Sequence, residues 1–248
     1  MPNDIQIGPL TFHMYGLMIG IGFVAAYLIC CRRAKEKKLN EDIIWGILLC
    51  AVLGAVTGTR LLYYIVSFRD ILRDPSILWD FSHGYVVYGG ILFGVLYSYI
   101  YCRVKKAPFL AYFDLVMPSV SVAQGFGRIG CFFSGCCYGK PTDSWLHITY
   151  THSDFAPNNI PLLPTQLLSS AGNFLIAAVL FAYDKKNKKQ GTVGALYMIL
   201  YSIGRFVIEM FRDDPRGAWG IFSTSQLISV FLFAAGAVCM RLFMRRPS

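Results

Sequence analysis

The segment 127–139 places Arg128 among four glycines at the end of a strongly apolar stretch of the sequence. An ionised side chain inside a membrane is costly, so it usually faces a cavity or a charged partner. The planar guanidinium of arginine stays charged at any biological pH and can give a phosphate two parallel hydrogen bonds. The neighbouring glycines, Gly127 and Gly130 among them, let backbone approach a head group closely. This pattern predicts a pocket for an anionic phospholipid.

Two further arginines, Arg60 and Arg205, also fall inside or at the ends of apolar stretches. Arg205 and Glu209 are four residues apart, which places both side chains on the same face of a helix. These two residues therefore either form an internal ion pair or serve the same anion pocket. Arg128 has no acidic residue nearer in its own stretch than Asp114, so an internal pair is the weaker alternative there. We expect the three arginines to converge from separate helices.

Two tyrosines precede glycines at the ends of apolar stretches. Tyr88 is followed by Gly89 and Gly90, and Tyr15 is followed by Gly16. Either tyrosine can contact a lipid head group or simply belong to the aromatic belt at a membrane interface. Because the chain has 15 tyrosines, the position of a single one is a weak signal.

Three of the eight cysteines cluster in the sequence, at Cys131, Cys136 and Cys137. With His147 and His152 they suggest zinc, although adjacent cysteines do not match the two-residue ligand spacing of structural zinc sites. A vicinal disulfide or a quinone-coupled thiol oxidant is a second alternative. The favoured interpretation is that they are small residues packed between helices. No metal and no cofactor is therefore predicted.

The composition of the chain indicates which kind of secondary structure positions these residues. Hydrophobic residues make up 55% of the 248 residues and charged residues only 15%, with a mean hydropathy of +0.50. A soluble protein is excluded because almost no helix would keep a polar face. Crossing the hydrocarbon core takes about 20 residues of α-helix. The sequence therefore predicts an all-α integral membrane protein with seven transmembrane helices, at about residues 11–31, 43–66, 86–102, 109–135, 165–183, 191–211 and 221–244.

The basic residues predict how these helices are oriented. With seven spans, 15 of the 23 lysines and arginines fall in one set of loops and five in the other. Under the positive-inside rule, this places the C-terminus in the cytoplasm and the N-terminus outside. The formal net charge of +9 then reflects topology and attraction to anionic lipid, with no nucleic-acid partner. No cleavable signal peptide is expected, so the first span is retained.

We expect one polytopic membrane domain, residues 1–248, with few long connections. Residues 138–164 carry four prolines and are predicted to form a small extracytoplasmic cap. The segment Ser67–Tyr85 also contains turn signals. Glycines at Tyr88–Gly90 and Gly125–Gly127 are candidates for short re-entrant pieces, because non-helical backbone at membrane depth must be buried or line a wet cavity.

With these residues in place, the chain resembles the prolipoprotein diacylglyceryl transferase family, seven-span bacterial enzymes that begin lipoprotein maturation. The similarity extends over almost the whole sequence, in the order and spacing of the family. Its pieces are Phe12–Met18, Gly58–Leu61, Tyr63 and Tyr64, Tyr88–Gly90, Asp114, Pro118, Gln124, Gly127–Gly130, Pro164–Leu167, Gly204–Arg212 and Ser225–Leu227.

The resemblance implies transfer of a diacylglyceryl group from phosphatidylglycerol to the lipobox cysteine thiol of a prelipoprotein, releasing glycerol phosphate, at the bacterial cytoplasmic membrane. Arg128 and Arg205 would hold the departing phosphate. Glu209 would orient Arg205 or accept a proton, and Tyr88 would complete the catalytic group. The implied partners are phosphatidylglycerol, the lipobox segment and membrane lipids. The implied substrate-binding positions are Tyr15, Arg60, Gly89, Gly90, Gln124, Gly127, Gly130, Gly139 and Gln166.

The chain departs from the family pattern at several positions. Tyr88 stands where many members carry a histidine, so a phenol replaces a proposed general base, and Glu209 or a phosphate oxygen is the alternative proton acceptor. Cys131 replaces a usual asparagine, and Cys136 replaces a common acidic residue. The stretch 163–169 also loses polar and aromatic positions. These departures leave two alternatives, a related phospholipid-dependent transferase with another acceptor and a lipid-binding membrane protein without turnover.

Overall fold

Seven helices in the described part of the chain are long and apolar enough to cross a membrane. They confirm the prediction of an all-α integral membrane protein with seven spans, while the orientation of the spans stays a prediction. The computed structural model describes residues 4–7, 10–80, 84–186, 189–214, 218–219 and 222–245. The seven helices are α1 (Met14–Glu36), α2 (Asp42–Val66), α4 (Val87–Val104), α5 (Phe109–Ser134), α6 (Thr165–Lys186), α7 (Thr192–Glu209) and α8 (Thr224–Met244).

The remaining elements are short. Helix α3 (Phe68–Arg73) and the 3₁₀ helix η1 (Pro75–Leu78) follow α2. The first span begins at Met14 instead of near residue 11, because the residues before it pair as a strand and not as a helical turn. Three antiparallel hairpins pair β1 (Asp4–Ile7) with β2 (Leu10–His13), β3 (Ile148–Thr149) with β4 (Pro161–Leu162), and β5 (Ala218–Trp219) with β6 (Phe222–Ser223).

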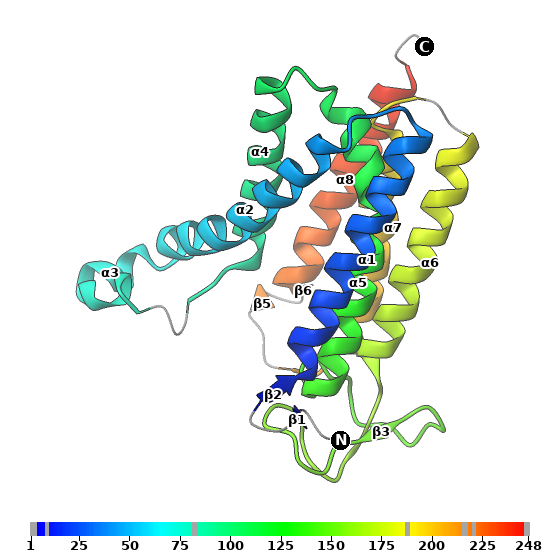
Figure 1. Ribbon diagram of the computed structural model, residues 1–248. Helices are drawn as coiled ribbons and strands as arrows, with labels where there is room; N and C mark the ends of the chain where they lie inside the picture. Colours follow the sequence, from blue (N-terminus) through cyan, green and yellow to red (C-terminus); the bar gives the residue numbers. More distant parts are fainter. Residues whose placement is uncertain are drawn as a thin grey trace. The chain divides into compact units, whose positions relative to one another are not determined.

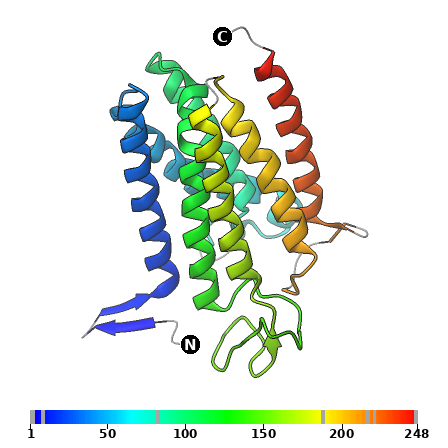
Figure 2. The same ribbon diagram turned by 90° about the vertical axis from the view of Figure 1, so that its right-hand side faces the viewer.

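The chain divides into two compact units, and each is described by itself. The first unit contains Met1–Cys30 and Phe113–Ser248, and therefore most of α1 and α5 together with α6, α7 and α8. Figures 1 and 2 show these five helices side by side. The Ser170 hydroxyl of α6 donates to the backbone oxygen of Gly125 at 2.9 Å, which joins α6 to the middle of α5. This unit carries Arg128, Arg205 and Glu209.

A buried carboxylate joins the start of α5 to the start of α7. Asp114 Oδ2 accepts a hydrogen bond from the Gly191 amide at 2.6 Å, and Oδ1 accepts one from the Gly194 amide at 2.8 Å. The first N–H groups of a helix have no partner within the helix and carry partial positive charge. Asp114 therefore caps α7 from a different helix and fixes these two ends together.

The second unit, Cys31–Tyr112, pairs α2 with α4 through glycines. A Cβ added to Gly58 would lie 2.5 Å from the Gly89 oxygen, and one added to Gly89 would lie 2.1 Å from the Gly58 oxygen. The backbones approach so closely because neither glycine has a side chain. The prediction of a short re-entrant piece at Tyr88–Gly90 is therefore wrong, because these residues belong to the continuous helix α4 and the glycines serve helix packing.

The glycines at 125 and 127 likewise lie inside the continuous helix α5, so the second expected re-entrant piece is also wrong. A Cβ added to Gly125 would meet the ring of Phe174 at 2.8 Å, which shows that this glycine admits an aromatic ring from α6. That ring stacks edge-on against Phe126, with centroids 5.5 Å apart. Close packing again explains a glycine that the sequence alone leaves ambiguous.

Residues 138–164 fold into a small irregular segment at the end of α5, held by the β3–β4 pair. Tyr150, Ala156 and Leu162 form its own buried core. The Tyr150 hydroxyl donates to the backbone oxygen of Phe132 at 3.0 Å, which ties the segment to α5. Burial raises the pKa of Tyr150 to about 12, so this hydroxyl keeps its proton and remains a donor. The extracytoplasmic location of the segment stays a prediction.

Candidate active site

A cavity of about 280 Å³ lies between α5, α6 and α7 of the first unit. Two arginines from different helices line it, Arg128 from α5 and Arg205 from α7. The structure thus brings together two of the three arginines predicted to converge. The full lining is Arg128, Leu168, Ser169, Gly172, Asn173, Ile176, Tyr201, Gly204, Arg205, Val207 and Ile208.

Arg128 lies in the last two turns of α5 and is partly buried. Its guanidinium makes no hydrogen bond and no ion pair with any residue that the structure describes. A Cβ added to the preceding residue, Gly127, would meet nothing within 4 Å beyond its chain neighbours, so α5 is not packed against another element at this position. A partly buried cation that makes no internal hydrogen bond or ion pair is stabilised by binding an external anion.

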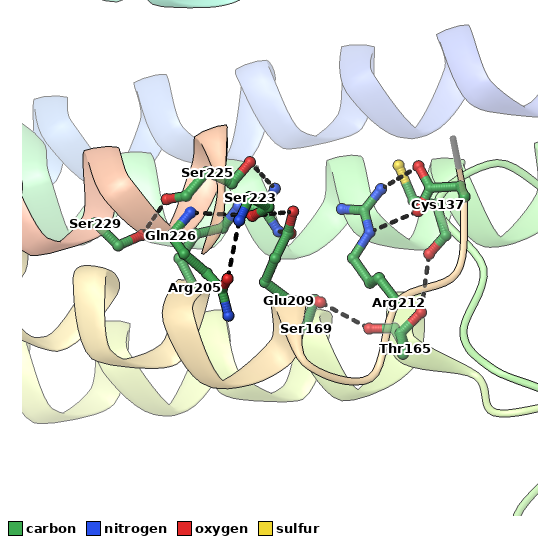
Figure 3. Close-up of polar contacts among 11 residues, drawn as sticks. Cys137, Thr165, Ser169, Arg205, Glu209, Arg212, Ser223, Ser225, Gln226 and Ser229 are labelled. Atoms are coloured by element: carbon green, nitrogen blue, oxygen red, sulfur yellow. Dashed lines mark hydrogen bonds and ion pairs between the residues drawn. The ribbon is translucent and has the colours of Figure 1, made fainter. Parts of the chain in front are cut away.

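Arg205 is held by its own helix and by α8. Its Nη1 lies 2.8 Å from Glu209 Oε2, and its Nη2 donates to the Ser225 hydroxyl at 2.9 Å. The side chains of Arg205 and Glu209 are only 13% and 4% exposed. The other Glu209 oxygen accepts from the Ser223 hydroxyl at 2.9 Å (Figure 3). The predicted spacing of four residues therefore produces a buried ion pair, and the arginine of that pair still lines the cavity.

Ser223 is the N-cap residue of α8, and this position places it beside Glu209. The Ser223 hydroxyl accepts from the Gln226 amide at 3.2 Å, and Gln226 Oε1 accepts from the Ser223 amide at 3.1 Å. This reciprocal pair is a capping box, which fixes the first turn of a helix. The local sequence Ser-x-x-Gln thus places a hydroxyl against the Glu209 carboxylate.

Arg212 is a buried arginine that belongs to the Gly204–Arg212 motif but was not among the predicted site residues. Its Nε and Nη2 donate to the two Asp214 oxygens at 2.9 and 2.8 Å, a bidentate pair. Burial raises the pKa of Asp214, although the Arg212 charge opposes this effect. The sequence signal that could have identified Arg212 is Asp214, an acidic residue two positions later and just beyond α7. Arg212 also pairs as an isolated antiparallel bridge with Gly139.

Gly139 and Gln166 hold the segment 138–164. A Cβ added to Gly139 would lie 2.5 Å from the Leu163 oxygen, so only glycine fits there. Gln166 is 1% exposed, and its Nε2 donates to the Cys136 oxygen at 2.8 Å and to the Tyr150 hydroxyl at 3.4 Å. Both residues lie outside the lining of the cavity, so their predicted contact with substrate stays a prediction.

Gln124, Gly130 and Tyr15 occupy helix contacts around Arg128. Gln124 Oε1 accepts from the Tyr197 hydroxyl at 3.0 Å, which joins α5 to α7. A Cβ added to Gly130 would lie 3.2 Å from Tyr15, so α1 packs on α5 at this point. The structure therefore brings Tyr15 to the end of α5 that carries Arg128, while its contact with substrate stays a prediction.

Arg60, Tyr88, Gly89 and Gly90 belong to the second unit. Arg60 is 7% exposed and donates to the Tyr64 hydroxyl at 3.0 Å and to the backbone oxygens of residues 78, 80 and 84. Its guanidinium carbon also lies 5.0 Å from the centre of the Tyr64 ring. These contacts make Arg60 an organiser of the turn after α2. Tyr88 is partly buried in the first turn of α4.

The three clustered thiols converge in space. The Sγ atoms of Cys131, Cys136 and Cys137 all lie within 4.8 Å of one another. Hydrogen bonds from the Cys131 and Cys136 thiols hold the pKa of the Cys137 thiol well below its usual range, and the Arg212 and Arg128 charges add to this effect against burial. Packing was the favoured interpretation of these residues from the sequence, and the structure adds that their sulfur atoms converge.

The cavity suits a phosphate in chemical terms. Two guanidiniums can neutralise a dianion, and donors fixed in a water-poor site stabilise charge that develops during a reaction. The apolar part of the lining suits acyl chains or a glyceryl backbone. The arrangement therefore supports binding of a phosphorylated lipid and departure of its phosphate.

Comparison with known proteins agrees with this interpretation. A family model described as prolipoprotein diacylglyceryl transferase matches residues 2–242. A phosphatidylglycerol–prolipoprotein diacylglyceryl transferase from Clostridium tetani is 45% identical over 95% of this chain and 94% of its own length. Similar proteins of the same name from Clostridium perfringens and Prochlorococcus marinus are 41% and 32% identical, over 93% and 95% of this chain and 91% and 88% of their own lengths.

Proposed function

We propose that the cavity lined by Arg128 and Arg205 holds the phosphate of the lipid donor. The chain belongs to the prolipoprotein diacylglyceryl transferase family. The chain is a multi-pass enzyme of the bacterial cytoplasmic membrane that transfers a diacylglyceryl group to prolipoprotein. The names of its relatives imply phosphatidylglycerol and prolipoprotein as substrates. The observation that carries the proposal is the Arg128 guanidinium, which makes no hydrogen bond or ion pair with any described residue and lines a cavity with a second arginine.

The reaction exchanges one bond at the glyceryl carbon next to the phosphate. The lipobox cysteine sulfur forms a C–S bond with this carbon, while the C–O bond to phosphate breaks and its electron pair leaves with the oxygen. The products are the thioether-linked prolipoprotein and glycerol phosphate, and the thiol proton passes to a base. Negative charge therefore grows on the phosphate as the bond breaks. Two arginine side chains on that phosphate favour the transition state over the bound lipid.

Glu209 is proposed to orient Arg205 and not to accept the proton. One of its oxygens lies against Arg205 and the other accepts from Ser223, so both are engaged inside the protein. Because both oxygens are already engaged by protein groups, the carboxylate is proposed to hold the Arg205 guanidinium in position. The remaining candidates for the proton acceptor are a phosphate oxygen and, in its phenolate form, Tyr88, the position that the family resemblance implies.

The orientation of the enzyme follows from the distribution of basic residues. We infer that the N-terminus and residues 138–164 lie outside the cytoplasm, so the end of α5 with Arg128 faces the outer leaflet. The lipobox segment of the prelipoprotein and surrounding membrane lipids would approach at this level. Cysteine labelling of an added residue in the 138–164 segment, with a reagent that does not cross membranes, tests this orientation in intact cells.

A transfer assay tests the assignment of the phosphate. The purified protein in detergent receives labelled phosphatidylglycerol and a lipobox peptide, and mass spectrometry follows both the lipidated peptide and glycerol phosphate. Arg128→Gln should lower kcat/KM by about 10²–10³, the effect of removing one preorganised donor. Arg32→Gln is the matched control, because Arg32 is 85% exposed at the end of α1 and should keep full activity. An Arg128→Gln protein with the wild-type rate would refute the assignment.

A further inference from the structure

The loop after α5 folds back so that three thiols meet. Helix α5 ends at Ser134, and Gly135 and Cys137 then adopt left-handed backbone with φ of 74° and 62°. This reversal returns Cys136 to the last turn of the helix, where its sulfur lies 3.8 Å from the Cys131 oxygen. All three cysteines are free thiols and partly buried. The cluster therefore arises from the backbone path and not from sequence spacing.

The surrounding protein holds this path against its conformational cost. A left-handed residue other than glycine costs on the order of 1–3 kcal/mol, and such strain is often retained at functional sites. The Thr165 hydroxyl donates to the Cys137 oxygen at 2.8 Å, and Gln166 donates to the Cys136 oxygen at 2.8 Å. Both donors are 1% exposed. Figure 3 shows the Thr165 contact beneath Cys137. Two buried side chains thus fix the backbone that presents the thiols.

We propose that Cys131, Cys136 and Cys137 form a three-sulfur site for a soft, thiophilic metal ion. Metal–sulfur bonds of about 2.3 Å place three sulfurs around one ion about 4.0 Å apart. The observed sulfurs lie within 4.8 Å of one another, so shifts below one ångström suffice. Among the described residues, no histidine or carboxylate joins the group. A ligand set made only of sulfur selects soft ions over hard cations such as Mg²⁺ and Ca²⁺.

The charges around the cluster fit a tri-thiolate. On binding, each thiol releases its proton to water, so three thiolates and a divalent ion carry one net negative charge. The positive charges of Arg128 and Arg212 act on these sulfurs and offset that charge. Cys131 also follows Arg128 by three residues, which places both on neighbouring positions of one helix face. An ion bound here would therefore hold the end of α5 beside the phosphate cavity.

Cadmium binding to the full-length protein tests this site. The protein is purified in detergent with a phosphine reductant and titrated with Cd²⁺, whose bonds to thiolates give an ultraviolet charge-transfer band. We expect saturation at one ion per chain, and Mg²⁺ in excess should not compete. In the same samples, the three clustered cysteines should be protected from maleimide labelling, as counted by peptide mass spectrometry. Protection is measured on the unaltered chain, so this result does not depend on the folding of any variant.

Cysteine variants locate the bound ion. Cys136→Ser and Cys131→Ser should each weaken Cd²⁺ binding by more than about 100-fold, the upper end of what loss of an outer-shell partner costs. Cys239→Ser, in α8, is the matched control and should bind like wild type. The proposal is overturned if Cd²⁺ produces no charge-transfer band, or if the band persists in the cluster variants. It is also overturned if two of the three cysteines form a disulfide that the phosphine does not reduce. None of these readouts requires transferase activity.

Discussion

Glu209→Gln removes the charge of one buried carboxylate and tests how the cavity keeps Arg205 in place. The carboxylate is 4% exposed, with one oxygen 2.8 Å from Arg205 Nη1 and the other 2.9 Å from the Ser223 hydroxyl. At an effective dielectric constant of about 20, opposite charges about 4 Å apart attract by about 4 kcal/mol. Removing one partner of a buried pair leaves the other charge uncompensated and costs about 3–5 kcal/mol. We expect Glu209→Gln to lower the free energy of unfolding by this amount.

A double-mutant cycle isolates the pair from its surroundings. Arg205→Gln alone leaves a buried carboxylate, whereas the double variant with Glu209→Gln removes both charges. The double variant should therefore be more stable than the sum of the two single effects predicts, by at least about 1.5 kcal/mol. Denaturant unfolding in detergent measures the four proteins. Effects that add within about 0.5 kcal/mol would refute the pairing.

An exposed ion pair with the same spacing provides a control for Glu209→Gln. Arg32 and Glu36 are also four residues apart and lie 3.4 Å from each other, but their side chains are 85% and 64% exposed. A solvated pair contributes only about 0–1 kcal/mol, so Glu36→Gln should change little. In the transfer assay, Glu209→Gln should lower kcat by about 10²–10³ because Arg205 loses its orientation. Full activity in Glu209→Gln would show that the pair is structural only.

Other predictions concern the proton acceptor and the helix contacts. Tyr88→Phe should lower the transfer rate by about 10²–10⁴ without changing the melting temperature, and an unchanged rate would assign the proton to a phosphate oxygen. Gly89→Ala should destabilise the protein by about 1–3 kcal/mol, because its Cβ would lie 2.1 Å from the Gly58 oxygen. Gly94→Ala is the matched control, since its Cβ would lie 3.6 Å from the nearest atom, and thermal unfolding compares the two. Asp114→Asn leaves one of two amides without an acceptor and should cost about 1–3 kcal/mol, measured in the same way.

The spans were predictable because the membrane imposes a single strong requirement. A segment in hydrocarbon must satisfy its own backbone and must be apolar for about 20 residues, so hydropathy alone locates it. The predicted spans accordingly match the seven helices, with shifts at the ends. The start of α1 was misplaced because Leu10–His13 is apolar enough for a span but pairs with another strand. Hydropathy carries no information about such pairing.

The site was predictable only where one helix contains both partners. The pairing of Arg205 with Glu209 follows from a spacing of four residues, which helix geometry converts into contact. The contact of Glu209 with Ser223 depends on how α8 begins, and no spacing rule connects the two positions. The convergence of the three thiols in space was not predicted, because two left-handed residues reverse the chain after α5. Zinc-motif spacing assumes a different turn, so it argued against a metal.

The cap that Asp114 provides at the start of α7 also sets the positions of Arg128 and Arg205 along their helices relative to each other. Arg128 lies 14 residues beyond Asp114, and Arg205 lies 11 residues beyond Gly194, along two helices that run in the same direction. At 1.5 Å per residue these lengths are about 21 and 17 Å. Arg128 and Arg205 therefore lie at similar distances from the Asp114 contact that joins the starts of α5 and α7. A shift of one helix by a single turn would move one arginine about 5.4 Å past the other, so the proposed phosphate site depends on the Asp114 carboxylate at the opposite end of the helices.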